Sequence, residues 1–198
     1  MGTKRNIVFI LGIFFFVLGL FSIAYSIYLK RYSEVIWFCY IGLVLIGLGL
    51  LFRKDKLVVA QLNILILPTI IWNIDFFYRL LTGESFWGIT DYFFLEGRSI
   101  IGNIISLQHI YTIPLVIYAL YLIKIKTKNA WRISVIQILL IFVISRLLTL
   151  ETNNVNCVFR PCFDFALTIP YTFGWIIAYF LIILITHFGL SNINFLKA

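Results

Sequence analysis

Charged residues are scarce in this sequence: Asp, Glu, Lys and Arg make up 12% of its 198 residues. A soluble domain carries about 25% charged and about 45–50% apolar residues, whereas 62% of this chain is apolar and its mean hydropathy is +1.03. There is no Gly-X-Y repeat and no long polar segment. A soluble globular fold, a collagen, a coiled coil and a disordered chain are therefore excluded, and a polytopic membrane protein remains.

Cysteine and histidine are also rare, with three and two residues. No CxxC, HExxH or similar spacing occurs, so we expect neither a metal nor a cofactor. The net charge of +8 is compatible with nucleic-acid binding. However, the basic residues lie in short loops between apolar runs, where the positive-inside rule explains them. We expect membrane lipids as partners and no nucleic acid; the oligomeric state stays open.

Six apolar runs cover most of the chain, and each approaches the roughly 20 residues that a spanning helix needs. They lie at 7–28, 35–52, 57–81, 104–123, 131–150 and 169–188. The runs do not alternate in polarity as strands of a barrel would, and a helix satisfies its own backbone hydrogen bonds in lipid. The sequence predicts one all-α domain over 1–198, a bundle of six transmembrane helices. The first run also has the pattern of a signal peptide, and an uncleaved signal anchor is the favoured reading over a cleaved one.

Charge predicts the orientation of this bundle. One side receives both termini and the loops at 53–56 and 124–132, with 10 basic residues and 1 acidic residue. The other side, including charges near the helix ends, receives 6 basic and 7 acidic residues. Because basic loops remain in the cytoplasm, we expect both termini to be cytoplasmic, in the plasma membrane of a prokaryote.

Reactive side chains in four predicted spans share one depth. Cys39, Asp75, His109 and Arg146 each lie four to six residues from the outer end of their run, which is roughly 6–9 Å below the outer boundary at 1.5 Å per residue. The inner halves of the same runs carry nothing comparable. An ionisable group within a span is by default a candidate functional residue, so this layer is the candidate site.

Helical spacing adds neighbours to the layer. Asp75 and Arg79 are four residues apart, so they share a face and can pair, with Trp72 close to that face. A purely structural role for this pair, as an ion pair near the membrane interface, is about as well supported as a functional one. Arg146, taken alone, more often extends outward to lipid phosphate.

His109 shares its face with Thr112, and Pro114 predicts a kink just beneath it. The alternative to a functional role is that His109 only forms a structural hydrogen bond between helices. Cys39 alone would be an inert apolar side chain, and its interest comes from lying at the depth of His109. The second histidine, His187, is expected at the inner interface.

The remaining cysteines, Cys157 and Cys162, lie in a loop assigned to the outer side. Their C-x4-C spacing around Pro161 suits a small disulfide loop in an oxidising compartment. The alternatives are two free thiols or an incomplete metal site. A disulfide is the favoured reading.

A thiol, an imidazole and a carboxylate can form a nucleophile–base–orienter relay. Cys39 would attack, His109 would take its proton, and Asp75 would hold the imidazole. Four further residues would bind the substrate: Arg79, Arg146, Thr112 and Trp72. The arginines would stabilise an oxyanion or a lipid phosphate. This chemistry predicts a cysteine-dependent acyltransferase or hydrolase of membrane lipids.

The segments WFCY at 37–40 and SLQHIYTIPL at 106–115 resemble the YwaF-type intramembrane acyltransferase family. They also resemble the androgen-induced family of multi-pass lipid hydrolases. Both families imply a bundle of similar size with an early intramembrane nucleophile and a later histidine. The acyltransferase family implies Cys39 and His109 in these roles. The hydrolases use threonine, which the second run lacks, so Cys39 would have to replace it.

Two other functions compete with the enzyme. Asp75, Arg79, His109 and Arg146 are also suited to a proton-coupled or small-molecule transporter, although no inverted repeat is evident. Alternatively, the polar layer fixes helix packing in a non-catalytic membrane scaffold.

Overall fold

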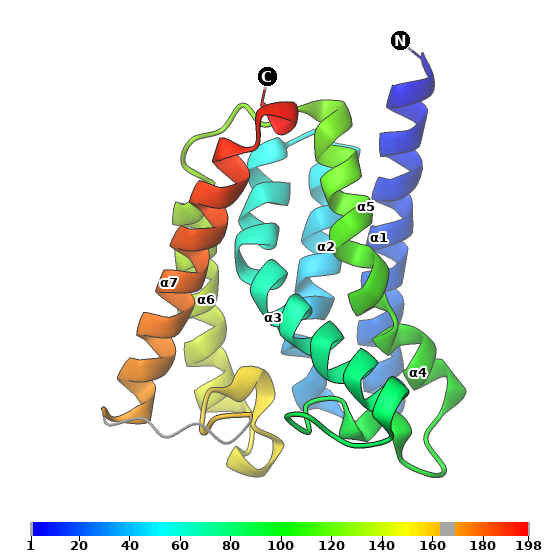
Figure 1. Cartoon of the computed structure of the whole chain (residues 1–198), viewed down its shortest axis with the longest axis vertical. Coiled ribbons are helices and arrows are strands. Elements are labelled where there is room, and N and C mark those ends of the chain that lie inside the picture. The colour runs from blue at the N-terminus through cyan, green and yellow to red at the C-terminus, as the bar shows by residue number, and fades with distance from the viewer. Residues whose placement is uncertain (1, 163–168, 198) are drawn as a thin grey trace.

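The computed structural model describes residues 2–162 and 169–197, and this part of the chain forms helices and loops, with one isolated bridge between Ile125 and Lys197. The α-helices are α1 (Gly2–Tyr28), α2 (Phe38–Leu51), α3 (Asp55–Thr82), α4 (Ile100–Ser106), α5 (Gln108–Ile123), α6 (Ala130–Leu148) and α7 (Tyr171–Asn192). Short 3-10 turns are η1 (Tyr32–Ile36), η2 (Asp91–Phe94), η3 (Glu151–Asn153), η4 (Val155–Cys157) and η5 (Asn194–Leu196). The predicted all-α class is confirmed (Figure 1).

Five helical segments are long and apolar enough to cross a membrane: α1, α3, α4 with α5, α6 and α7. The sixth, α2, has 14 residues and extends for about 21 Å, less than the roughly 30 Å of a hydrocarbon core. The sequence predicts a span at 35–52, but the helix begins only at Phe38. Its first residues belong to η1, and Trp37, with φ −54° and ψ 133°, ends that turn in a non-helical conformation.

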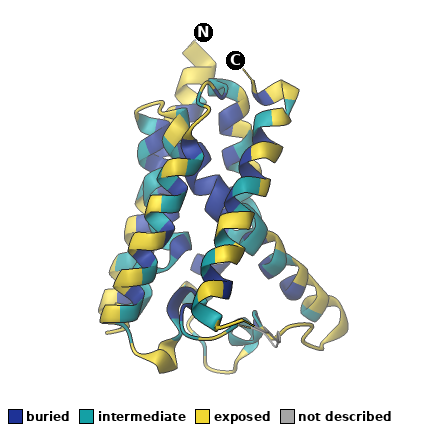
Figure 2. Ribbon diagram, turned by 90° about the vertical axis from the view of Figure 1, so that its left-hand side faces the viewer, coloured by how far each residue is buried: buried dark blue, intermediate teal, exposed yellow. Residues whose placement is uncertain are grey.

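The surface of the bundle is apolar. Figure 2 shows exposed residues along the outward faces of the long helices and buried residues along their inward faces. Many exposed side chains are large and aliphatic or aromatic, for example Ile10 at 62% exposure, Leu140 at 57% and Phe188 at 61%. Such a surface is stable against lipid but not against water. The chain is thus a helical protein of the integral-membrane class.

The tightest contact in the bundle joins α1 to α2, and it depends on glycine. A Cβ atom added to Gly47 would lie 2.4 Å from the backbone nitrogen of Phe16, and one added to Gly19 would lie 2.7 Å from that of Val44. Any side chain at these positions would push the two backbones apart. Small residues allow this close approach in membrane helices, where dispersion contacts replace the hydrophobic effect between helices.

The two ends of the bundle differ in charge. Figure 1 places both termini at one end, with the loops that follow α2 and α5. At that end the carboxylate of Asp55 accepts hydrogen bonds from the backbone nitrogens of Lys126 and Thr127, at 2.7 and 2.8 Å. The loops after α1, α3 and α6 lie at the other end. Asp164, one of the acidic residues assigned to that side, lies outside the described residues.

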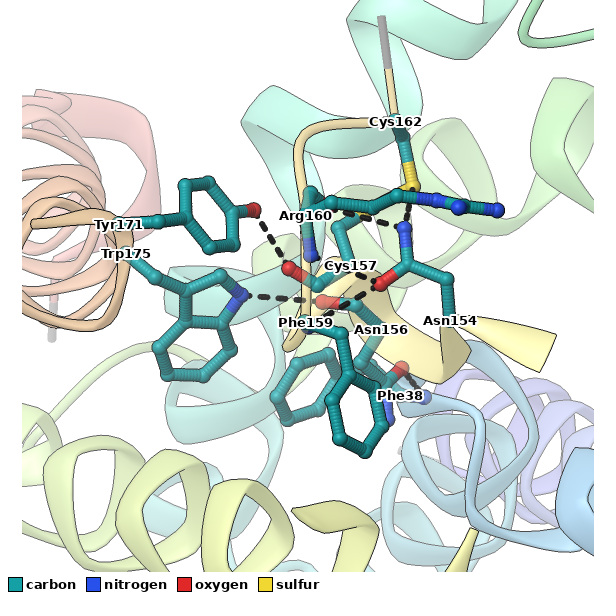
Figure 3. Close-up of a disulfide and its surroundings, with 9 residues drawn as sticks. All are labelled: Phe38, Asn154, Asn156, Cys157, Phe159, Arg160, Cys162, Tyr171 and Trp175. Atoms are coloured by element: carbon teal, nitrogen blue, oxygen red, sulfur yellow. Dashed lines mark hydrogen bonds between the residues drawn. A yellow bond between two sulfur atoms is a disulfide. The ribbon is translucent and has the colours of Figure 1, made fainter. Parts of the chain in front are cut away.

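The predicted disulfide is present: Cys157 and Cys162 are bonded, with their Cα atoms 5.5 Å apart. Figure 3 shows how the loop that carries it reaches α2 and α7. Asn156 accepts from the backbone nitrogen of Phe38 at 2.9 Å and donates to the carbonyl of Ile36 at 2.9 Å. One side chain therefore holds both sides of the bend that begins α2.

Candidate functional site

A break at Leu107 divides the fourth predicted span into α4 and α5. At this break the N–H of Ile110 donates to the carbonyl of Leu107 at 3.0 Å, so it does not serve the carbonyl of Ser106, its usual helical acceptor. Instead, Nδ1 of His109 lies 2.8 Å from the oxygen of Ser106. The broken helix thus holds the His109 ring.

This contact fixes the tautomer of His109. A carbonyl oxygen only accepts, so Nδ1 carries the proton and Nε2 of the neutral ring is left with its lone pair. The ring is also stacked on Trp72, with centroids 4.7 Å apart and planes 20° from parallel. Within 2–162 and 169–197, no residue hydrogen-bonds to Nε2. The imidazole is therefore rigidly placed and offers one free acceptor.

His109 lines an open groove of about 440 Å³ between α3 and α5. The other lining residues are Thr69, Ile70, Asn73, Ile74, Phe77, Ile110, Ile113 and Pro114. Three of them, Ile70, Ile74 and Phe77, are 43–47% exposed on the outward face of α3. Asn73 joins the two helices, donating from Nδ2 to the carbonyls of Thr69 and His109, both at 2.8 Å. The groove is lined mostly by apolar side chains, and its polar residues are Thr69, Asn73 and His109.

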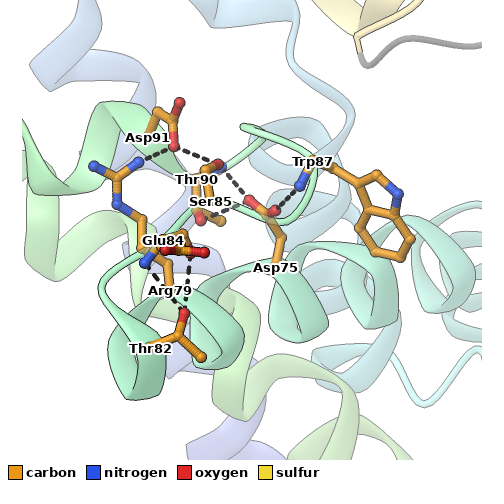
Figure 4. A network of polar contacts seen from close by, with 8 residues as sticks. All are labelled: Asp75, Arg79, Thr82, Glu84, Ser85, Trp87, Thr90 and Asp91. Carbon is orange, nitrogen blue, oxygen red and sulfur yellow. Dashed lines mark hydrogen bonds and ion pairs between the residues drawn. The ribbon is translucent and has the colours of Figure 1, made fainter.

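Asp75 organises the loop after α3. Its side chain has no solvent exposure and accepts three hydrogen bonds, from the backbone nitrogens of Trp87 and Thr90 and from the hydroxyl of Thr90, at 2.6–2.7 Å. Figure 4 shows the carboxylate with these donors around it. Its acceptor positions are thus occupied by the loop. No hydrogen bond joins it to His109 in the described part of the chain.

Arg79 pairs with Asp91, not with Asp75 as the i,i+4 spacing suggested. The side chain of Asp75 is directed into the loop, whereas Asp91 lies on η2 and also accepts from the hydroxyl of Ser85 at 2.7 Å. The guanidinium of Arg79 additionally lies 4.9 Å from the centre of the Phe94 ring. Asp75 and Arg79, the two charged residues in the last turns of α3, therefore hold one loop.

Cys39 is the second residue of α2 and is partly buried. Its sulfur interacts with the side chain of Gln108, the residue before His109. Because consecutive helical residues point about 100° apart, Gln108 faces the thiol while His109 faces Trp72. The described residues contain no hydrogen bond that links Cys39, Asp75 and His109 to one another. The three side chains, which the sequence predicts at one depth, are held by different partners.

A second polar cluster covers the outer side of Trp72. The indole nitrogen of Trp72 donates to the hydroxyl of Tyr92 at 2.9 Å. Arg98 donates to the carbonyl of Tyr92 at 2.9 Å and to the hydroxyl of Ser106 at 3.2 Å. Burial raises the pKa of Tyr92 and lowers the pKa of Arg98. The phenol therefore stays protonated, and the cluster closes the outer end of the site without a carboxylate.

The last two predicted substrate-binding residues lie apart from the groove. Arg146 donates to the hydroxyl of Thr172 at 2.9 Å, and its guanidinium lies 4.9 Å from the centre of the Phe159 ring. It thus ties α6 to α7 and to the disulfide loop. Thr112 is buried on α5, and its hydroxyl has no hydrogen-bond partner in the described chain.

The inner half of the bundle is more polar than the sequence suggested. Gln61 of α3 and Gln137 of α6 exchange two side-chain hydrogen bonds, at 2.7 and 2.9 Å. Two residues further along α3, Asn63 donates to the hydroxyl of Ser134 at 3.1 Å. The inner half of the bundle therefore also holds a polar network, built from amides and a hydroxyl and joining α3 to α6.

His187 belongs to this inner network. It is 4% exposed, with Nδ1 3.5 Å from the amide nitrogen of Asn63 and Nε2 3.1 Å from the carbonyl of Lys128. It was expected at the membrane interface. A signal was available, because Gln61 and Gln137 are amides that interrupt two apolar runs near their inner ends.

Comparison with family models, curated proteins and solved structures finds no match. Residues 2–162 and 169–197 also contain no group of three or more His, Cys, Asp or Glu side chains that could hold a metal ion. The class of the protein thus rests on its helices and surface, and any activity must be argued from the site.

Proposed function

We propose that this protein is an intramembrane acyltransferase or hydrolase of membrane lipids that acts at the depth of the outer leaflet. The observation that carries the proposal is the apolar groove between α3 and α5, which holds His109 with Nε2 free. An acyl chain suits such a slot, because its walls are aliphatic and it opens on the lipid-facing surface. An ester carbonyl of the same lipid would meet the imidazole.

Orientation is part of the proposal. The termini and the loops rich in lysine and arginine share one end of the bundle (Figure 1), which supports a cytoplasmic location for that end. The groove and the disulfide lie toward the opposite end. An oxidising environment there is compatible with a bonded Cys157 and Cys162, as expected outside a prokaryotic plasma membrane.

The proposed reaction has two steps. In the first, the sulfur of Cys39 adds to the acyl carbonyl, a C–S bond forms, and the C–O bond to the lipid alcohol breaks as that alcohol takes up the thiol proton. In the second, the oxygen of water or of an acceptor alcohol adds to the thioester carbon, the C–S bond breaks, and the proton returns to the thiol. His109 carries the proton in both steps through Nε2.

Proton transfer between Cys39 and His109 requires either a movement of the imidazole or a molecule that bridges the two side chains. His109 is stacked on Trp72, and Gln108 occupies the side of α5 that faces Cys39. The imidazole must therefore turn away from Trp72, or a water or substrate hydroxyl must connect it to the sulfur, since general-base catalysis needs direct or one-water contact.

Proteoliposomes containing a phospholipid with a radiolabelled acyl chain test the proposal. We expect a hydroxylamine-labile label on Cys39 and release or transfer of the chain. Cys39→Ala abolishes both, and His109→Gln lowers the rate at least about 100-fold, the lower end of general-base contributions. The matched control is His187→Gln, which removes the other histidine and leaves the rate within about twofold. Wild-type turnover in Cys39→Ala would contradict the cysteine mechanism.

The inner network favours one competing function, a proton-coupled carrier. Gln61, Gln137, Asn63 and His187 place polar groups in the half of the bundle opposite His109. The two layers together are what a polar pathway across the protein would need. Proton uptake into proteoliposomes, followed with an entrapped pH dye, would depend on His187 if the carrier is correct, whereas acyl transfer would not.

A further inference from the structure

Two buried polar groups on one face of α5 lack a partner. Gln108 is 2% exposed and Thr112 is 4% exposed; within the described chain, neither Nε2 of Gln108 nor the hydroxyl oxygen of Thr112 has a hydrogen-bond partner. They are four residues apart and therefore lie on the same side of the helix. A buried amide donor left without an acceptor is destabilising, and a ligand that accepts a hydrogen bond from Gln108 would remove that cost.

The side chain of Gln108 is directed at a nucleophile. Its amide lies near the sulfur of Cys39, and Nε2 has no hydrogen-bond partner in the described chain. The amide group thus lies beside the sulfur without being saturated by it. A donor in this position is free to bind an oxygen atom of a group attached to the sulfur.

A second donor converges on the same place. Cys39 lies in the first turn of α2, where backbone N–H groups have no acceptor within the helix. The N–H of Phe38 is bound by Asn156 and that of Tyr40 by Trp37. No acceptor for the N–H of Cys39 itself occurs among residues 2–162 and 169–197, and this N–H also interacts with the sulfur.

We infer that Gln108 Nε2 and the backbone N–H of Cys39 form an oxyanion-binding pair for acyl transfer at Cys39. The substrate class is a long-chain acyl ester, so the inference rests on the proposed function. When the sulfur adds to the carbonyl carbon, the C–S bond forms and the π electrons of the carbonyl move to its oxygen. The two N–H groups bind that oxygen until it re-forms the carbonyl and expels the alcohol. Preorganised donors of this kind stabilise the transition state more than the ground state.

Removing the side-chain donor gives the first measurement. In proteoliposomes with a labelled phospholipid, Gln108→Ala should lower kcat for Cys39 acylation by about 100- to 1000-fold, with KM little changed, as loss of one oxyanion donor does elsewhere. Gln137→Ala is the matched control, because it removes a glutamine amide from the inner network and should stay within about twofold of wild type.

A pair of thiol reagents separates an oxyanion role from packing. A long-chain alkyl trifluoromethyl ketone adds to a thiol and places an oxyanion beside it, whereas methyl methanethiosulfonate modifies the sulfur without one. Gln108→Ala should weaken the ketone about 100-fold and leave the rate of modification by the thiosulfonate unchanged. Equal losses with both reagents would mean a packing role, and no loss with the ketone would remove the inference.

The behaviour of the wild-type protein distinguishes failure of the proposed enzyme activity from failure of the proposed role of Gln108. If wild-type protein forms no thioester on Cys39 and does not bind the ketone, the proposed function fails and the inference fails with it. If wild-type protein is acylated and Gln108→Ala is acylated equally fast, the enzyme stands and only the role of Gln108 is overturned.

Discussion

His109 and Asp75, both predicted in one polar layer, differ in what surrounds them. The imidazole is fixed through one nitrogen and one face, by Ser106 and Trp72, and its other nitrogen is free. The carboxylate of Asp75 is enclosed by donors from its own loop. A group that is to react must retain an open position, so His109 is the better candidate for chemistry and Asp75 for holding the structure.

Asp75→Asn should therefore loosen the loop and not only slow a reaction. The substitution replaces one acceptor oxygen by an NH2 group that faces N–H donors, and a buried unsatisfied donor costs about 1–3 kcal/mol. We expect faster tryptic cleavage at Arg98 and a lower thermal midpoint in detergent. Asp91→Asn is the control: the side chain of Asp91 is 48% exposed, and pairs at that exposure contribute about 0–1 kcal/mol. An Asp75→Asn protein as resistant as wild type would contradict this role.

Helix α2 is short because a distant loop binds the backbone where the helix begins. Asn156, 118 residues along the chain, binds the backbone at both sides of Trp37. On its inward side the same helix contacts α1 through glycines. These two contacts hold Cys39 in the first turn of α2. A substitution that disrupts either contact would move the sulfur relative to Gln108.

Gly47→Ala should destabilise the bundle. The new Cβ would lie 2.4 Å from the backbone of Phe16, so α1 and α2 must separate, and overpacking of this kind costs about 1–3 kcal/mol. Gly189→Ala in α7 is the matched control, since nothing lies within 4 Å of its added Cβ and alanine favours a helix. Thermal unfolding in detergent should show a lower midpoint for the first variant only. Equal midpoints would mean that α1 and α2 tolerate separation.

Whole-molecule organisation consists of two polar layers in an apolar bundle. The outer layer contains His109 and Cys39, whereas the inner layer contains Gln61, Asn63 and His187. Each inner pair joins different helices, so the inner layer cross-links α3, α6 and α7. The outer layer leaves Nε2 of His109 and Nε2 of Gln108 unpartnered. The inner layer also has an unpartnered atom, Oδ1 of Asn63, so the preference for chemistry at the outer layer depends on the reactive groups there, the imidazole of His109 and the thiol of Cys39.

Cysteine labelling tests the orientation of the molecule. In intact cells, Cys157 and Cys162 should react with a membrane-impermeant maleimide added outside, but only after reduction of their disulfide. A double variant, Cys157→Ser with Cys162→Ser, keeps Cys39 alone and should not label, because that thiol is partly buried within the bundle. Labelling that requires opened cells would reverse the proposed topology.

Local chemistry determined the class of this protein. Runs of apolar residues predict helices in lipid wherever they lie in the chain, so the all-α class and the long apolar helices could be predicted from the sequence. The disulfide followed from a separation of 5 residues. Each of these features depends on neighbours along the chain, which composition and spacing describe.

Only the tertiary structure determined which polar side chains pair with one another. Arg79 binds Asp91 because Asp75 is enclosed by its loop, and His187 is buried because Asn63, 124 residues away, meets it in the bundle. The break at Leu107 directs His109 toward Trp72 and Gln108 toward Cys39. A hydrogen-bonding side chain accepts any suitable partner within about 3 Å, and only the packing of distant helices determines which partner comes that close.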